Sequence, residues 1–168
     1  MMLEIALDAD GEWDSSHPWE PLVRKATEAA IAESAFPDLS RASRKVELSV
    51  RLSSDDEVRS LNAHWRGKDK PTNVLSFPMS EGYELDSADE DGPSLMLGDI
   101  ILARGVCEAE AEHNGVSVED HAAHLVVHGT LHLLGYDHQS DSDAADMEAR
   151  EVRALARIGI SDPYAVNH

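Results

Sequence analysis

The stretch from Val118 to His138 reads V-E-D-H-A-A-H-L-V-V-H-G-T-L-H-L-L-G-Y-D-H, and it decides much of how this chain folds. Its apolar residues recur with helical spacing from Val118 to Leu134, which predicts a helix anchored in the core by its leucines. Gly135 comes next, and a glycine there can adopt the left-handed conformation that ends a helix and turns the chain. We therefore expect a core helix whose end is followed by a tight turn.

Strand and helix patterns alternate along the rest of the chain. Period-two alternation or short apolar runs predict four strands, at residues 3–7, 45–52, 73–77 and 95–102. Helical spacing predicts four further helices, at 18–34, from Ser53 or Ser54 through His64, at 106–113 and at 144–158. The pattern predicts an α/β (α+β) class, with a single mixed sheet packed against about five helices in one domain over residues 1–168.

The bulk composition restricts the class of protein. No apolar run is long enough to span a bilayer, and the N-terminus carries acids where a signal peptide needs basic residues. We therefore expect a cytoplasmic protein with no membrane partner. The single cysteine, Cys107, excludes an internal disulfide, which leaves a nucleophile or, more commonly, a small buried side chain.

Charge is distributed unevenly along the chain. The formal net charge is −19, which argues against nucleic acid, yet eight of the fourteen basic residues fall between Arg41 and Lys70. The segment Glu81 to Asp91 holds six acids in eleven positions, and we expect it to be a flexible loop near the cleft. A local basic patch of this kind can hold a polyanion, although a solvated charged face explains the charge equally well.

Six of the nine histidines lie between His113 and His138. His128 and His132 are four residues apart on the predicted core helix, so both side chains project from one face, and Gly135 turns the chain so that His138 returns toward them. Three neutral imidazoles leave one position of a tetrahedral ion open, as in catalytic zinc sites. We predict one Zn²⁺ per chain at His128, His132 and His138, with nickel or copper as alternatives and ordinary packed histidines as the simpler reading.

Two neighbours of the predicted ligands are ambiguous. His124 lies one turn before His128 on the same face, where it supports a ligand, takes part in catalysis or is merely packed. Asp137 orients a ligand imidazole or only shapes the turn. Metzincin proteases share the histidine spacing, but they need a glutamate base where this chain has Gly129, so a metalloprotease is the less favoured interpretation.

Three blocks of the chain carry a family resemblance. The first is H-G-T-L-H-L-L-G-Y-D-H, the second is Leu61-Asn62 followed by W-R-G-K-D-K-P-T-N-V-L-S-F-P from Trp65 to Pro78, and the third is L-G-D-I-I from Leu97 to Ile101. In this content and order they resemble the YbeY family of bacterial endoribonucleases. The match covers most of the chain from Leu61 to His138.

The resemblance implies a single-strand-specific endoribonuclease that acts in 16S rRNA 3′-end maturation and ribosome quality control, with the small ribosomal subunit as partner and no DNA substrate. It implies that the three matching histidines bind zinc and that Arg66 is important for activity. An arginine in a basic segment suits this role, because it can bind the scissile phosphate and stabilise its developing charge. Lys68 and Lys70 would steer the RNA backbone, while Thr72, Asn73 and Ser76 either line the cleft or cap a strand.

A second hypothesis from a different class stays open. The protein is then a ribosome-assembly factor whose zinc site is mainly structural. Loss of folding on metal removal would favour that role, whereas loss of cleavage without unfolding would favour catalysis.

Overall fold

The computed structural model describes residues 3–10, 13, 18–42, 44–86, 88, 90, 92–137 and 139–164, without the side chains of Ser40, Arg41 and Tyr83. None of the helices in this part of the chain has the length and apolar character needed to span a bilayer.

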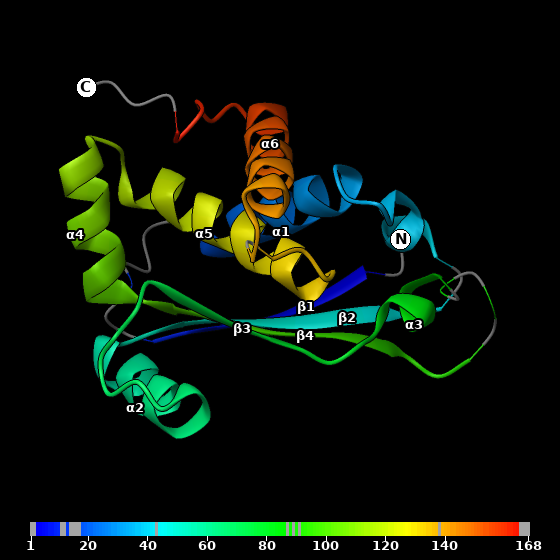
Figure 1. The fold of residues 1–168 in the computed structure, drawn as a ribbon, viewed down its shortest axis with the longest axis horizontal. Helices are drawn as coiled ribbons and strands as arrows, with labels where there is room; N and C mark the ends of the chain where they lie inside the picture. The colour runs from blue at the N-terminus through cyan, green and yellow to red at the C-terminus, as the bar shows by residue number, and fades with distance from the viewer. Residues whose placement is uncertain are drawn as a thin grey trace.

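A four-stranded mixed sheet forms the centre of the fold (Figure 1). Its spatial order is β1-β2-β4-β3, with β1 at Leu3–Ala9, β2 at Val46–Ser53, β3 at Val74–Pro78 and β4 at Leu95–Ala103. β1 and β4 both pair with β2 in parallel, whereas β3 pairs with β4 antiparallel and forms an edge of the sheet. The alternating sequence of β2 explains its central place, because Val46, Leu48, Val50 and Leu52 are all buried.

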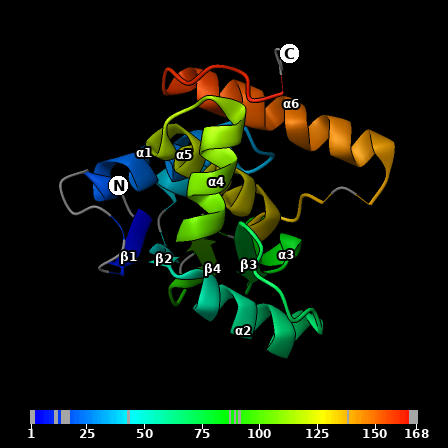
Figure 2. The ribbon, with the colours of Figure 1, turned by 90° about the vertical axis from the view of Figure 1, so that its left-hand side faces the viewer.

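The described residues also form six helices and one short 3₁₀ turn, and the longer helices lie on both faces of the sheet. One face of the sheet is covered by α1, α4, α5 and α6, and the other face by α2. Both Figure 1 and Figure 2 show this arrangement. Their bounds are α1 Trp19–Ala32, η1 Pro37–Arg41, α2 Asp55–Arg66, α3 Gly82–Asp86, α4 Arg104–Asn114, α5 Val118–Leu133 and α6 Asp141–Arg157. The predicted α+β class with one mixed sheet is confirmed, with six helices where about five were expected.

Serine caps set the start of three helices. Ser54, Ser117 and Ser140 each accept a hydrogen bond from the backbone N–H three residues on, which satisfies one of the unpaired donors at the start of α2, α5 and α6. The cap at Ser140 explains why α6 begins at Asp141 rather than at the predicted Ala144.

α5 packs against α1 and against strands β3 and β4, which makes it the core helix that the sequence predicted. Leu125, Val126, Leu131 and Leu133 are fully or almost fully buried. Gly129 allows its close approach to β4, because a Cβ at this position would lie 3.0 Å from the side chain of Ile100. Gly129 therefore faces the sheet, where packing requires a small residue.

The acidic segment is only partly a loop. Residues Gly82–Asp86 form the short helix α3, so the prediction of a loop through the whole segment is wrong there. The reason is that Leu85 and Ala88 are buried, which gives an otherwise acidic stretch an apolar anchor. The segment lines a hollow with residues 35–39 that contains none of the predicted site residues, and Ser87, Asp89 and Asp91 lie outside the described residues.

Candidate functional site

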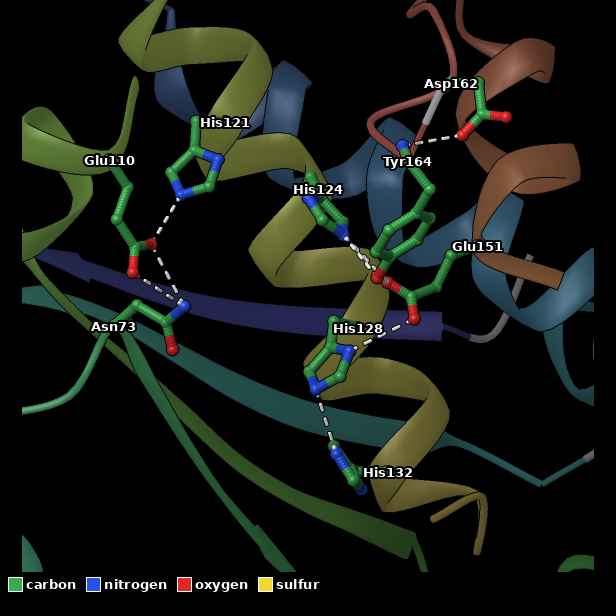
Figure 3. A network of polar contacts seen from close by, with 9 residues as sticks. All are labelled: Asn73, Glu110, His121, His124, His128, His132, Glu151, Asp162 and Tyr164. Carbon is green, nitrogen blue, oxygen red and sulfur yellow. Dashed lines mark hydrogen bonds and ion pairs between the residues drawn. The ribbon is translucent and has the colours of Figure 1, made fainter. Parts of the chain in front are cut away.

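Two histidines on the last turns of α5 point at each other. The Nε2 atoms of His128 and His132 are 3.0 Å apart, and their ring centroids are 4.6 Å apart with the planes nearly perpendicular (Figure 3). The spacing of four residues places both rings on one face of the helix, as predicted. The two Nε2 atoms thus lie within hydrogen-bonding distance of each other.

A buried carboxylate lies behind this pair. Glu151 of α6 is 0% exposed, and its Oε2 accepts a hydrogen bond of 3.2 Å from Nδ1 of His128. Burial acts to raise the pKa of the Glu151 carboxyl, but the hydrogen bonds and charge offered by His124 and His128 outweigh it and lower that pKa to about 2. Because an ionised carboxylate only accepts, Nδ1 of His128 carries a proton, so the neutral form of this imidazole has its lone pair on Nε2, the nitrogen that faces His132.

The other oxygen of Glu151 binds two more groups. Its Oε1 accepts hydrogen bonds of 2.8 Å from Nε2 of His124 and 2.8 Å from the hydroxyl of Tyr164 (Figure 3). Tyr164 belongs to the segment after α6, and its backbone N–H is held by Asp162. Burial and the negative charge of Glu151 raise the pKa of the Tyr164 hydroxyl well above its usual range, so it stays a donor. One carboxylate therefore organises two histidines of α5.

The donor set fits a zinc ion in its chemistry. Two nitrogens that each lie 2.0–2.1 Å from one ion at the tetrahedral angle are about 3.3 Å apart, close to the observed 3.0 Å. The carboxylate that orients His128 is the support that zinc-binding histidines commonly have. Within the part of the chain that the structure describes, no group of three His, Cys, Asp or Glu side chains forms a metal site. The third predicted ligand, His138, lies outside the described residues.

The turn after α5 is fixed in place. Gly135 has a φ of +97°, as predicted, and its N–H donates to the carbonyl of His132. The Tyr136 hydroxyl accepts a hydrogen bond of 2.8 Å from the N–H of Ala35, and the Arg150 guanidinium lies 4.8 Å over the Tyr136 ring. The chain therefore leaves the histidine pair along a path tied to the segment after α1 and to α6.

A second carboxylate binds the same row of histidines nearer the start of α5. Glu110 of α4 contacts Nε2 of His121 at 2.8 Å and accepts a hydrogen bond of 3.0 Å from the amide of Asn73 (Figure 3). The His121 and His124 rings lie 5.9 Å apart, so the row is continuous along the helix. This contact connects the histidine face of α5 with the start of β3.

The predicted RNA-binding cations line one hollow beside Glu110. This hollow has a volume of about 360 Å³, and its walls include Arg66, Lys68, Lys70, Asn73 and Glu110. Among the described residues, none of the three cations is paired with a carboxylate. Thr72 also lines the hollow, and Ser76 does not. The positive charges are thus available to an anion that enters.

The loop that carries these cations is held rigidly to α2. Gly67 ends the helix with a φ of +69°, and the N–H of Lys68 donates to the carbonyl of Asn62. The buried Asn62 amide donates to the carbonyl of Lys70, and Arg59 pairs with Asp69 at 2.8 Å. The spacing of the two lysines is therefore set before any ligand binds.

Sequence reasoning missed the partners of the histidines. Glu151 and Glu110 look like any other acids in a chain with 33 of them, and Tyr164 lies 26 residues beyond His138. One signal was present, because Met147, Glu151, Ala154 and Leu155 share the inward helical spacing of α6, and only one of them is charged. Cys107 is buried, and burial together with nearby Glu110 and Glu108 raises the pKa of its thiol to about 12, so it is not a nucleophile.

Known proteins resemble this chain over nearly its whole length. Residues 12–159 match the sequence model of a family described as Endoribonuclease YbeY. Proteins described by the same words occur in Rhizorhabdus wittichii, 49% identical over 166 residues with 98% of both chains covered, and in Novosphingobium aromaticivorans, 52% identical over 164 residues with 96% of both covered. The solution structure of TM1509 from Thermotoga maritima is 26% identical, covers 92% of this chain and 91% of its own, and has a TM-score of 0.54.

Proposed function

The chain belongs to the endoribonuclease YbeY family, and from this membership we propose that it is a zinc-dependent endoribonuclease of single-stranded RNA. The family and the enzyme class, a nuclease that hydrolyses phosphodiester bonds, are those that the three sequence blocks implied. We propose 16S rRNA 3′-end maturation and ribosome quality control as its tasks, the small ribosomal subunit as its partner, and the cytoplasm, where that rRNA matures, as its location. Residues 1–168 act as one domain in this proposal.

The observation that carries the proposal is the convergence of His128 and His132, 3.0 Å apart, in front of the buried Glu151. We propose that these two histidines and His138 hold one Zn²⁺. Bound there, zinc would polarise a phosphoryl oxygen and make a water molecule more acidic. Glu151 keeps the proton of His128 on Nδ1, so that Nε2 presents its lone pair to the ion.

The cations of the hollow supply the substrate-binding part of the proposal. Arg66 offers a planar guanidinium that can bind a phosphate through two N–H groups and offset the charge that develops on it. Lys68 and Lys70 hold the RNA backbone without reading its sequence. Glu110 and His121 connect this hollow to the histidine row.

Of the three roles that the sequence left open for His124, this proposal favours support of the histidine site over catalysis. Its Nε2 is bound to Glu151 at 2.8 Å and lies 3.2 Å from the Tyr164 hydroxyl. These contacts support a positioning role, in which His124 helps to hold Glu151, over direct proton transfer to RNA.

Metal analysis beside RNA cleavage tests the proposal. We expect His132→Ala to lose zinc and cleavage of single-stranded RNA while it keeps its circular dichroism spectrum. His113→Ala is the matched control, because His113 is an exposed histidine at the end of α4 and should keep both properties. A His132→Ala protein that retains zinc and full cleavage would contradict the site.

The alternative, an assembly factor with a structural zinc ion, makes the opposite prediction for metal removal. Leu131 and Leu133 bury α5 in the core without any contribution from a metal, which supports a catalytic ion. We therefore expect the zinc-free protein to stay folded in a thermal scan. Unfolding after chelation would favour the structural role.

A further inference from the structure

Trp65 is the one exposed tryptophan of the three in this chain. Trp13 and Trp19 are 2% and 6% exposed and pack edge-to-face with centroids 5.1 Å apart. Trp65, in the last turn of α2, is 64% exposed. An indole that leaves so much of its surface in water contributes only part of its area to the fold.

The Trp65 ring is nevertheless held in place. Its centroid lies 4.8 Å from that of His64 at 86° and 6.3 Å from that of Phe77 on β3 at 61°. Both contacts are edge-to-face, so neither neighbour occupies the parallel stacking position on the indole. Phe77 packs in turn against a small buried cluster, Val58, Leu75, Ile101 and Ala103, which anchors the arrangement to the sheet.

The residues that follow Trp65 in the chain carry positive charge. Arg66 follows it directly in the chain, and Lys68 and Lys70 lie in the rigid loop after it, all three lining the same hollow. An exposed aromatic ring next in the chain to cations that have no carboxylate partner among the described residues is a combination with which proteins bind single-stranded nucleic acid, because every base has a stackable face and every nucleotide carries a phosphate. A base within a duplex cannot offer its face in this way.

We propose that Trp65 is a stacking platform for one unpaired base of an RNA strand whose backbone lies in the hollow of Arg66, Lys68 and Lys70. This inference rests on the proposed function and deepens it, since it assigns a base-binding position outside the histidine site. It commits to RNA rather than to a protein partner because the adjacent charge is complementary to phosphate.

A fluorescence titration with an unstructured single-stranded RNA of about ten nucleotides tests the platform. Because Trp13 and Trp19 are buried, we expect the quenching caused by RNA to come from Trp65 and to vanish in Trp65→Phe. Trp65→Ala should bind this RNA about tenfold more weakly, whereas Trp65→Phe, which keeps an aromatic face, should stay within about threefold. The same strand annealed to its complement should bind both wild type and Trp65→Ala alike.

A lysine variant separates stacking from charge. Lys70→Ala should reduce the dependence of binding on salt, while Trp65→Ala should leave that slope unchanged because it removes no charge. Equal affinity of wild type and Trp65→Ala for the single strand would overturn the platform and point to a protein partner for the indole. Fluorescence quenching that persists in Trp65→Phe would also overturn the platform, because it would come from Trp13 or Trp19. A wild-type protein that neither binds nor cleaves the strand would refute the proposed function itself, so the two failures are distinguishable.

Discussion

Replacing Glu151 with glutamine should weaken zinc binding while leaving the fold largely intact. The substitution keeps the volume of the fully buried side chain but changes what its two terminal atoms can do. The carboxylate accepts from three donors, the rings of His124 and His128 and the Tyr164 hydroxyl. A glutamine has one accepting oxygen and an NH₂ group that only donates, so it cannot satisfy both histidines in their present tautomers.

The size of the effect follows from these contacts. If the glutamine oxygen stays with His124 and Tyr164, its NH₂ group faces Nδ1 of His128, and two donors then oppose each other. His128 is relieved by moving its proton to Nε2, the nitrogen that lies 3.0 Å from His132 and that zinc needs unprotonated. Loss of such a supporting contact typically costs 10–100-fold in metal affinity. Stability should fall by about 1–2 kcal/mol, the cost of one unsatisfied buried hydrogen bond.

Glu151→Ala is the harsher form of the same perturbation. It removes the acceptor and leaves a cavity beside three donors that have lost their partner, so we expect about 3–5 kcal/mol of lost stability. The glutamine variant is therefore the informative one, because it separates metal affinity from folding.

Zinc affinity is best measured by competition with a chromophoric chelator, alongside urea unfolding of the metal-free proteins. Glu148→Gln is the matched control, since Glu148 is an exposed acid on the same helix and makes the same change in charge. Tyr164→Phe removes a donor to Glu151 but none to His128, so its zinc affinity should match that of wild type. If Glu151→Gln binds zinc within about twofold of wild type, then Glu151 does not set the protonation of His128 and the argument fails.

Three further predictions concern the rest of the molecule. Arg66→Ala should weaken binding of single-stranded RNA and reduce the salt slope of log Kd by about 0.7 without a shift in Tm, since its side chain is exposed; an unchanged slope would exclude a phosphate contact. Glu33→Gln should cost about 1 kcal/mol near neutral pH, because hydrogen bonds from Arg157 and then Arg153 hold the pKa of Glu33 below 4.5. A group with a lowered pKa stabilises the fold above its unfolded value, so this difference between wild type and variant should shrink as pH falls below about 4.5 in urea titrations. Gly98→Ala should cost about 3 kcal/mol or more in the same assay, because its φ is +141° and a Cβ would lie 2.2 Å from the carbonyl oxygen of Phe77, whereas Gly82→Ala meets no atom within 4 Å and should be nearly neutral.

Local patterns predicted the elements of this fold well. Alternation in β2 and helical spacing in α5 depend on residues two to four apart, and the serine caps and Gly135 act within one turn. The order β1-β2-β4-β3 depends instead on pairing between distant strands, which no local pattern specifies. The short helix α3 was not predicted, because its acidic composition resembles that of a loop. Its stability comes from burial of Leu85 by tertiary contacts.

The sequence predicted the residues of the candidate site only where they lie close together in the chain. His128 and His132 share one helix, so the sequence alone placed them on one face. Glu151 follows His128 by 23 residues and reaches it only because α6 packs across α5, a contact that depends on the whole fold. The cations of residues 66–70 lay in one segment and were found for that reason, although the sequence did not reveal that Glu110 would share their hollow.

The two carboxylates that bind the α5 histidines differ in exposure, so salt screens their contacts to different extents. Glu151 is 0% exposed, so water and salt hardly screen its contacts, and the geometry of His128 is held under all ionic conditions. The Glu110 side chain is 38% exposed and lies in the hollow with Arg66, Lys68 and Lys70, so its contact with His121 is open to screening and to the charge of a bound phosphate. The contacts of Glu151 on the α6 side of the histidine row should therefore respond little to salt, whereas the contact between Glu110 and His121 on the α4 side should weaken as salt is added. Affinity for RNA should then depend strongly on salt even where affinity for zinc does not.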